Sequence, residues 1–315
     1  MKFHLHYRKC VLIGLLPLLI GLPLAAQDLD PRSYIRLPLK TYTVITGYSF
    51  SYGGVLTDPT LPIENMEASV HTASLGYAQS LNLLGLSSQI MLSLPYSWAS
   101  VSGLVTGQQQ SVARSGLADS RLRLTVLVLG APAVDLEEFM TAPKKTILGV
   151  SMSLGMPTGE FFSEKLINIG TNRWSFKPEV ALSQPLGKRW LLDFYSGVWF
   201  FSSNYSFYPG SSVRSQEAMG AFQLHISYNI TPRFWVAYNA TYYTGGRSSI
   251  DDTFNDDRQS NTRIGLTAVL PVGKSNSIRL AASTGAVVRV GQDFTTYSVG
   301  WQHSWIGKTA KDKSN

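Results

Sequence analysis

The stretch Phe294-Thr-Thr-Tyr-Ser-Val-Gly-Trp-Gln-His-Ser-Trp305 decides the fold that we expect for this chain. Large side chains recur at every second position from Tyr297 to Trp305, and small or polar ones occupy the positions between them, from Ser298 to Ser304. Successive side chains of a strand point to opposite faces, so this period of two predicts a strand with one apolar and one polar face. Such a strand suits a wall with lipid outside and water inside.

The same alternation runs along most of the chain. It is clearest where Leu122 and Leu124 alternate with Arg121, Arg123 and Thr125, because charges in the middle of a strand need water behind them. We expect further strands at 41–52, 67–81, 86–98, 117–129, 146–156, 173–183, 190–201, 217–230, 234–244, 257–270 and 278–289. The sequence therefore predicts an all-β fold, a closed antiparallel transmembrane β-barrel of about twelve strands over residues 41–305.

The first 26 residues have the composition of a secretory signal peptide. Three basic residues precede an apolar run over residues 10–24, and Ala25-Ala26 supply small residues for cleavage. The run is too short to span a bilayer comfortably. We expect a signal peptide at 1–26, a periplasmic N-terminal segment at 27–40, and a polar periplasmic tail at 306–315 after the barrel.

Removal of the signal peptide changes the charge and the cysteine count. The number of Lys and Arg residues falls from 27 to 24 against 20 acidic residues, so the formal net charge falls from +7 to +4. Such a charge gives no support for a nucleic-acid partner. The single cysteine, Cys10, also leaves, so disulfides and thiolate metal sites are excluded from the mature chain. After Ala26 no apolar run reaches the length of a transmembrane helix.

Connection lengths and aromatic residues point to the same fold. Short and long connections alternate along the chain, with two exceptions. The connection 130–145 is long where a short one is expected, and the connection 291–293 is short where a long one is expected. Bacterial barrels place short turns in the periplasm and longer loops outside, and aromatic girdles lie at both interfaces. Tyr, Trp and Phe residues fall near strand ends here. A soluble β-sandwich would explain the alternation, but not the signal peptide, the girdles and the loop asymmetry.

Several motifs resemble a bacterial family called putative MetA-pathway of phenol degradation. They are Ser115-Gly-Leu-Ala-Asp119, Leu129-Gly-Ala-Pro-Ala133, Glu137-Glu-Phe139, Asn168-Ile-Gly-Thr-Asn-Arg-Trp174, Tyr242-Tyr-Thr-Gly-Gly246 and Asp257-Arg-Gln-Ser-Asn261. The resemblance implies a barrel in the bacterial outer membrane, exported through the periplasm and often described as a transporter. The last strand also resembles the C-terminal signal of such barrels, which implies the barrel-assembly machinery as a partner.

The polar faces of the expected strands supply the candidate site. The lumen candidates are Asp119, Arg121, Arg123, Arg173, Lys177, Glu179, Asp193, Tyr195, Trp199, Glu217, Tyr243, Arg263, Arg279 and Arg289. Mixed charges can line an aqueous path, or they can pair across the lumen as a polar core. Barrels of about 8 strands are filled by side chains and those of 16–18 hold a channel, so a barrel of about twelve permits both.

We expect a channel or transporter for small solutes. Aromatic or hydrophobic compounds are one option, because the lumen candidates Tyr195, Trp199 and Tyr243 could bind them. The alternative is a structural or interaction barrel that does not conduct. The barrel would contact outer-membrane lipid and lipopolysaccharide. No cofactor or metal site is indicated. His225-Ile-Ser227 has the same His-x-Ser spacing as the catalytic residues of an outer-membrane phospholipase. The alternation of this strand turns both side chains inward, away from lipid. We therefore expect no enzyme.

Overall fold

The computed structural model describes residues 29–56, 63–105 and 107–307, which form one closed antiparallel β-barrel. The expected signal peptide and most of the expected tail lie outside these residues. The twelve barrel strands of the described chain are β1 (Thr41–Leu56), β2 (Ile63–Leu83), β3 (Leu86–Val105), β5 (Ser120–Leu129), β6 (Ile147–Met156), β7 (Ser175–Leu186), β8 (Trp190–Phe201), β11 (Met219–Asn229), β12 (Trp235–Gly245), β15 (Gln259–Val272), β16 (Asn276–Val287) and β17 (Gly291–Ile306). The predicted fold class is confirmed.

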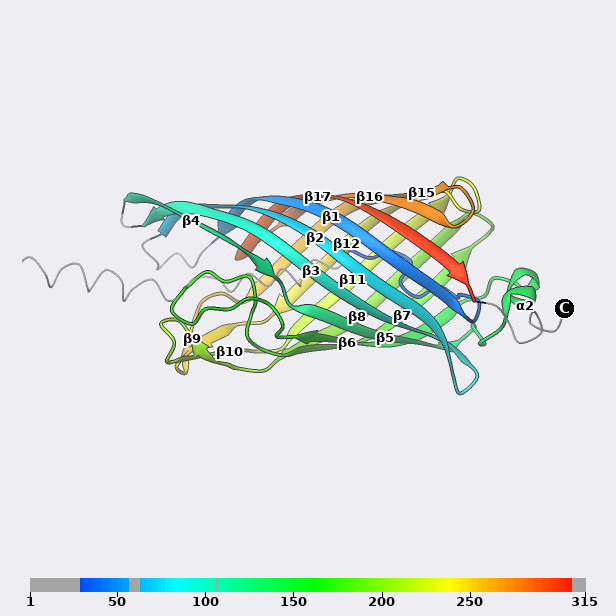
Figure 1. Ribbon diagram of the computed structural model, residues 1–315, viewed down its shortest axis with the longest axis horizontal. Coiled ribbons are helices and arrows are strands. Elements are labelled where there is room, and N and C mark those ends of the chain that lie inside the picture. The colour runs from blue at the N-terminus through cyan, green and yellow to red at the C-terminus, as the bar shows by residue number, and fades with distance from the viewer. Residues whose placement is uncertain (1–28, 57–62, 106, 308–315) are drawn as a thin grey trace, which may run out of the picture.

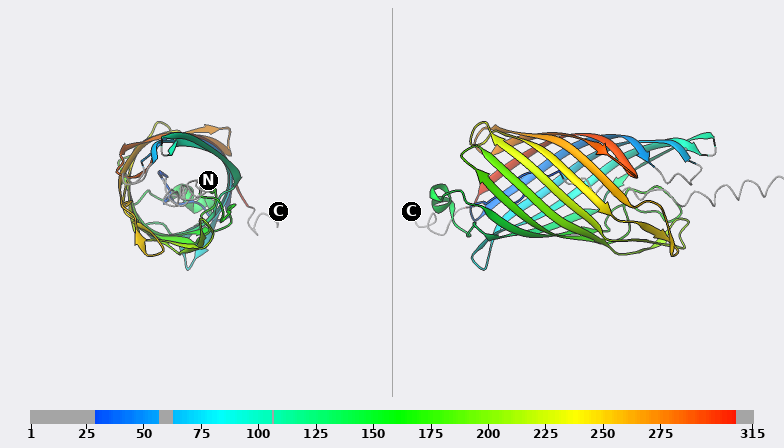
Figure 2. Two further views of the ribbon diagram at one scale, coloured as in Figure 1. Left: turned by 90° about the vertical axis from the view of Figure 1, so that its left-hand side faces the viewer. Right: turned by 180° about the vertical axis from the view of Figure 1, so that it is seen from behind.

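The last strand closes the ring against the first. β17 pairs with β1 along its whole length, from Ile306 opposite Thr41 to Gly291 opposite Leu56. The Tyr42 and Trp305 rings stack with their centroids 5.6 Å apart. Each barrel strand pairs with its two neighbours, and β2 pairs with β3, so the barrel has no open edge. Figure 1 shows the tilted strands, and the view along the axis in Figure 2 shows the ring.

The alternation places apolar side chains outside and polar ones inside. On β5, Leu124 is 39% exposed, whereas its neighbour Thr125 is 4% exposed and faces the interior. On β17, Val299 is 45% exposed, and Ser298 lines the interior. An exposed apolar band around a closed ring of strands is the surface that a lipid environment requires. The predicted faces of both strands are therefore correct.

The two ends of the barrel differ. At one end, called the long-loop end, β3 extends beyond the ring and pairs with one extra strand, β4 (Gln108–Leu117). A four-stranded sheet of β9 (Asn204–Phe207), β10 (Ser212–Gln216), β13 (Ser248–Ile250) and β14 (Thr253–Phe254) lies at the same end. At the other, the short-turn end, most connections are tight turns (Figure 1).

The expected long connection at the short-turn end contains a short helix, α2 (Leu136–Thr141). The side chain of Asp135 accepts a hydrogen bond from the backbone N–H of Glu138 and so caps the helix N-terminus. Asp135-x-x-Glu138 has the spacing of a capping box at a helix start. No helix of the described residues is long and apolar enough to cross a membrane.

Candidate functional site in the barrel lumen

The described part of the N-terminal segment, residues 29–40, enters the barrel at the short-turn end, and Tyr34 anchors it there. Tyr34 is fully buried, and its hydroxyl donates a hydrogen bond to Glu179 at 2.9 Å and lies 2.7 Å from the Ser151 hydroxyl. Its ring packs against the Tyr195 ring at 4.9 Å. These partners all project inward from barrel strands, so residues around Tyr34 fill part of the lumen (Figure 2).

Backbone groups beside Tyr34 bind the same wall. The Arg32 N–H donates to the carboxylate of Asp193 at 3.3 Å, and the Ser33 N–H donates to the Tyr195 hydroxyl at 3.2 Å. The Arg32 guanidinium lies 4.3 Å from the ring centre of Trp235. Asp193, fully buried, also accepts a hydrogen bond from Ser183. The candidate Asp193 therefore holds the N-terminal segment.

On the opposite side, Arg279 of β16 binds the start of the described chain. It donates to the Leu29 carbonyl at 3.1 Å and forms an ion pair with Asp30 at 3.0 Å. At the short-turn end, the Arg36 guanidinium lies over the Phe139 ring of α2. Residues 29–34 of the expected N-terminal segment therefore lie inside the barrel. The sequence shows no signal for this location, because the segment is too short and irregular to have a periodicity.

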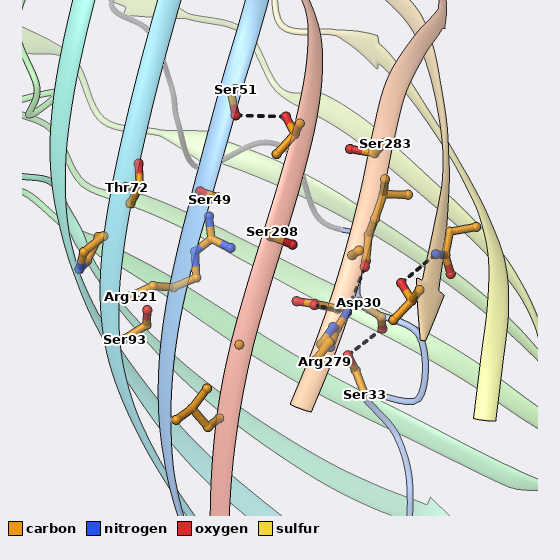
Figure 3. A pocket seen from close by; sticks show the side chains of 18 of the residues that line it. Asp30, Ser33, Ser49, Ser51, Thr72, Ser93, Arg121, Arg279, Ser283 and Ser298 are labelled. Atoms are coloured by element: carbon orange, nitrogen blue, oxygen red, sulfur yellow. Dashed lines mark hydrogen bonds and ion pairs between the residues drawn. The ribbon is translucent and has the colours of Figure 1, made fainter. Parts of the chain in front are cut away.

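The lumen has two unlike walls, and a cavity of about 520 Å³ lies between the N-terminal segment and the wall of small residues. Tyr34 packs against β6, β7 and β8, whose inward side chains include Ser151, Glu179 and Tyr195. Gly149 makes room for the ring, since a Cβ there would lie 2.5 Å from its Cδ1. Hydroxyl side chains dominate the other wall: Ser49, Ser51, Thr72, Ser93, Ser97, Ser283, Thr296 and Ser298 (Figure 3).

Charged candidates line the same cavity. The cations are Arg121, Arg123, Lys177 and Arg279, and the acidic residues are Asp30, Asp119 and Glu179. The predicted candidates on β5 and β7 thus meet in one place. Sequence reasoning missed Asp30, Tyr34 and the hydroxyl wall, although the alternation of Ser and Thr along β1, β3 and β17 was visible.

Glu179 is the centre of a buried ionic network. Its carboxylate accepts hydrogen bonds from Tyr34, from Arg123 at 3.1 Å and from Gln223 at 3.3 Å, and it forms an ion pair with Lys177 at 2.9 Å. Arg123 also lies 4.9 Å from the centre of the Tyr34 ring. Buried charges require such pairing, because desolvation of an unpaired carboxylate costs several kcal/mol. This part of the lumen follows the paired-core alternative.

Asp119 instead holds a loop at the long-loop end. Its carboxylate accepts hydrogen bonds from the backbone N–H groups of Gly159 and Thr171 at 3.0 Å and from the Thr171 hydroxyl at 2.5 Å. Ile169 of this loop is buried and packs in a cluster that includes Phe294. The loop therefore folds over the lumen, and the motif segments around residues 115–119 and 168–174 meet there.

The aromatic candidates occupy two places. Trp199 and Tyr243 are buried in a cluster with Met219 near the long-loop end. The charged groups of Arg121 and Lys177 lie 5.2 and 5.1 Å from the Trp199 ring centre. Neither Trp199 nor Tyr243 lines the cavity, whereas Tyr195 does and also supports Tyr34.

Arg173 and Arg263 are buried near the long-loop end. Arg173 donates to the Gln216 side chain at 2.5 Å and lies 4.4 Å from the ring centre of Phe201. Burial and the nearby positive charge of Arg214 lower the pKa of Arg173, which precedes β7, to about 9. Arg263 donates to the Phe294 carbonyl at 2.8 Å.

Two candidates lie outside the lumen. Glu217 is exposed just before β11, and its backbone N–H donates to the Arg247 carbonyl. Arg289 follows β16 and forms an ion pair with Asp256 at 2.7 Å. In both cases the alternation was extended past the end of a strand, where it no longer determines the side-chain direction.

His225 and Ser227 point inward, as predicted, and both are fully buried. His225 Nδ1 is 2.9 Å from Asn239 Oδ1, and Asp193 lies opposite His225 in the strand register. Sequence reasoning missed these partners, because they come from other strands. The His225 Nε2 and the Ser227 hydroxyl have no hydrogen-bond partner in the described chain, so they do not bond to each other. The residues described include no cluster of His, Cys, Asp and Glu that could hold a metal ion.

A closed antiparallel barrel with an apolar outer face and a polar, charged lumen defines the outer-membrane class of β-barrel. The chain belongs to the family "Putative MetA-pathway of phenol degradation", whose profile matches residues 65–312. This confirms the resemblance found in the motifs. A search of curated proteins finds no match.

Solved structures share the fold. The crystal structure of the COG4313 outer membrane channel from Pseudomonas putida F1 is 21% identical, with a TM-score of 0.77 over 88% of this chain and 100% of that one. The transport unit of the autotransporter AIDA-I from Escherichia coli is 11% identical, with a TM-score of 0.51 over 94% of this chain and 98% of that one. At these identities the similarity establishes the fold.

Proposed function

We propose that this protein is an outer-membrane channel for small solutes. The observation that carries the proposal is the cavity of about 520 Å³ inside the barrel, with its polar and charged lining. A structural core would be packed at this position, because cavities forfeit packing energy. The similarity to a protein described as an outer membrane channel supports the same function.

The ends of the barrel give the orientation of this channel. Short turns face the periplasm and long loops face outward in bacterial barrels, so the N-terminal segment enters the lumen from the periplasmic side. In this proposal the signal peptide directs export, and the closing strand, β17, is recognised by the barrel-assembly machinery. The outer face would contact membrane lipid and lipopolysaccharide. Aromatic or hydrophobic solutes stay a prediction from the three aromatic candidates Tyr195, Trp199 and Tyr243.

A pair of adjacent substitutions on β17 tests the channel. Ser298→Trp places a large ring in the cavity and is expected to reduce the single-channel conductance in planar bilayers by about half or more, because lumen substitutions tune permeation. Val299→Trp places the same ring in the apolar outer face and should leave the conductance unchanged. Heat-modifiable gel mobility checks that both variants are folded.

The second candidate is a non-conducting interaction barrel. It is favoured by the occupied lumen, where the N-terminal segment and the loop held by Asp119 both lie inside. Folded wild-type protein that stays silent in bilayers and in liposome-swelling assays would contradict the channel. Equal conductance of the wild type and Ser298→Trp would show that ions do not pass through this cavity.

A further inference from the structure

The cavity offers hydroxyl groups from five neighbouring strands, β16, β17, β1, β2 and β3. Two of the contacts between them are short: Ser51 to Thr296 at 2.9 Å and Thr72 to Ser97 at 2.8 Å. Each hydroxyl both donates and accepts hydrogen bonds, and it can rotate to suit its partner. Such a wall matches a solute that carries several hydroxyl groups of its own.

The charges of the lining favour an anion. Four cationic and three acidic side chains line the cavity. The acidic groups already have donors within the protein: Glu179 is bound by two cations, Asp30 by Arg279, and Asp119 by the loop that it holds. The net charge of the lining is therefore positive, and its carboxylates are already bound by protein donors.

Arg121 is placed to contact a solute. Arg121 lines the cavity together with Ser49, Thr72 and Ser93, which are labelled in Figure 3. A guanidinium carries five N–H donors in a planar fork that matches a carboxylate bidentately. The guanidinium carbon also lies 5.2 Å from the centre of the Trp199 ring.

Elsewhere in the lumen, donors also outnumber acceptors. The buried side-chain atoms without a hydrogen-bond partner in the described chain include Nε of Arg123, Nη1 of Arg173, and Nε and Nη1 of Arg263. These nitrogens all carry protons and accept nothing. A path lined in this way attracts negative charge.

From these observations we infer that the cavity binds small hydroxylated anions, the class of the sugar acids and other hydroxycarboxylates. The inference rests on the proposed channel and narrows its solute class. Arg121 takes the carboxylate, and the wall that contains Ser49 and Ser298 takes the hydroxyl groups. A cavity of about 520 Å³ has the size of ordinary small-molecule sites, which span about 300–1,000 Å³.

Equilibrium binding to the purified full-length protein in detergent tests the inference without the need for conduction. Isothermal titration calorimetry would compare gluconate with sorbitol, which keeps the hydroxyls but lacks the charge, and with benzoate, which keeps the charge but lacks the hydroxyls. Gluconate is expected to bind about tenfold more tightly than either, since a charge-assisted hydrogen bond and the hydroxyl contacts are both needed.

Two lumen variants locate the binding. Arg121→Gln should weaken gluconate binding about tenfold or more, whereas the matched change Arg189→Gln, at an exposed position beside Tyr228, should leave it unchanged. Ser298→Ala should weaken gluconate and leave benzoate unaffected. Ser298→Ala also serves if Arg121→Gln fails to assemble.

Tighter binding of benzoate or phenol than of gluconate would overturn the inference in favour of an aromatic solute. Equal gluconate affinity in the wild type and the folded Arg121→Gln variant would also overturn it, as would the absence of any binding. Conduction without gluconate binding refutes this inference alone. Gluconate binding without conduction supports the site and refutes the channel.

Discussion

Replacement of Tyr34 by alanine is expected to release the start of the N-terminal segment from the lumen and to raise the single-channel conductance several-fold. Loss of a buried aromatic ring costs about 3–5 kcal/mol, and loss of a hydrogen bond to a charged group about 1.5–3 kcal/mol. Tyr34 contributes both, through Tyr195 and Glu179. Glu179 keeps Arg123 and Lys177 as partners, so the barrel wall should stay intact.

Trypsin provides a second measurement of this release. Arg32 is bound inside the wild-type lumen, and cleavage after it should become fast in folded Tyr34→Ala. Tyr205→Ala, at an exposed position of the long-loop end, is the matched control and should behave as wild type. Gly149→Val should act like Tyr34→Ala, since its side chain would occupy the place of the Tyr34 ring. Fast cleavage with wild-type conductance would show that the segment does not restrict the channel.

The second large effect concerns the outer face. Leu124→Arg is expected to prevent assembly, because an arginine on the lipid face near the midplane costs about 2–4 kcal/mol. Leu124 is 39% exposed and is surrounded on β5 by other apolar outward residues. The measurement is the fraction of heat-modifiable, folded barrel in outer-membrane preparations.

The control for this experiment is Ser298→Arg, which places the same charge in the polar cavity and should assemble. Thr125, the neighbour of Leu124, is a poorer control, because it is 4% exposed and pairs in register with Ser151, which contacts Tyr34. Leu124→Ala separates the loss of the leucine from the gain of charge and should assemble. Equal yields of Leu124→Arg and Ser298→Arg would mean that the faces are reversed.

The candidate site was only partly predictable. Alternation correctly turns Arg121, Lys177 and Glu179 inward, because a period of two is a local property of each strand. It misplaces Glu217 and Arg289, which lie beyond the ends of β11 and β16. Whether a lumen charge lines a path or is paired depends on which strands face each other, and this information is not local. Glu179, for example, is paired with Arg123 of β5 as well as with Lys177 of its own strand.

The sequence by itself determined the barrel. About twelve strands and their faces follow from alternation, since the side-chain direction in a strand is decided by the backbone within two residues. Only the tertiary structure decided what fills the barrel. Tyr34 lies in the lumen because Gly149, Ser151, Glu179 and Tyr195, from three different strands, form a site for one ring and one hydroxyl. Contacts between residues so far apart in the chain produce no periodic pattern in the sequence. They form only when the strands close into a ring.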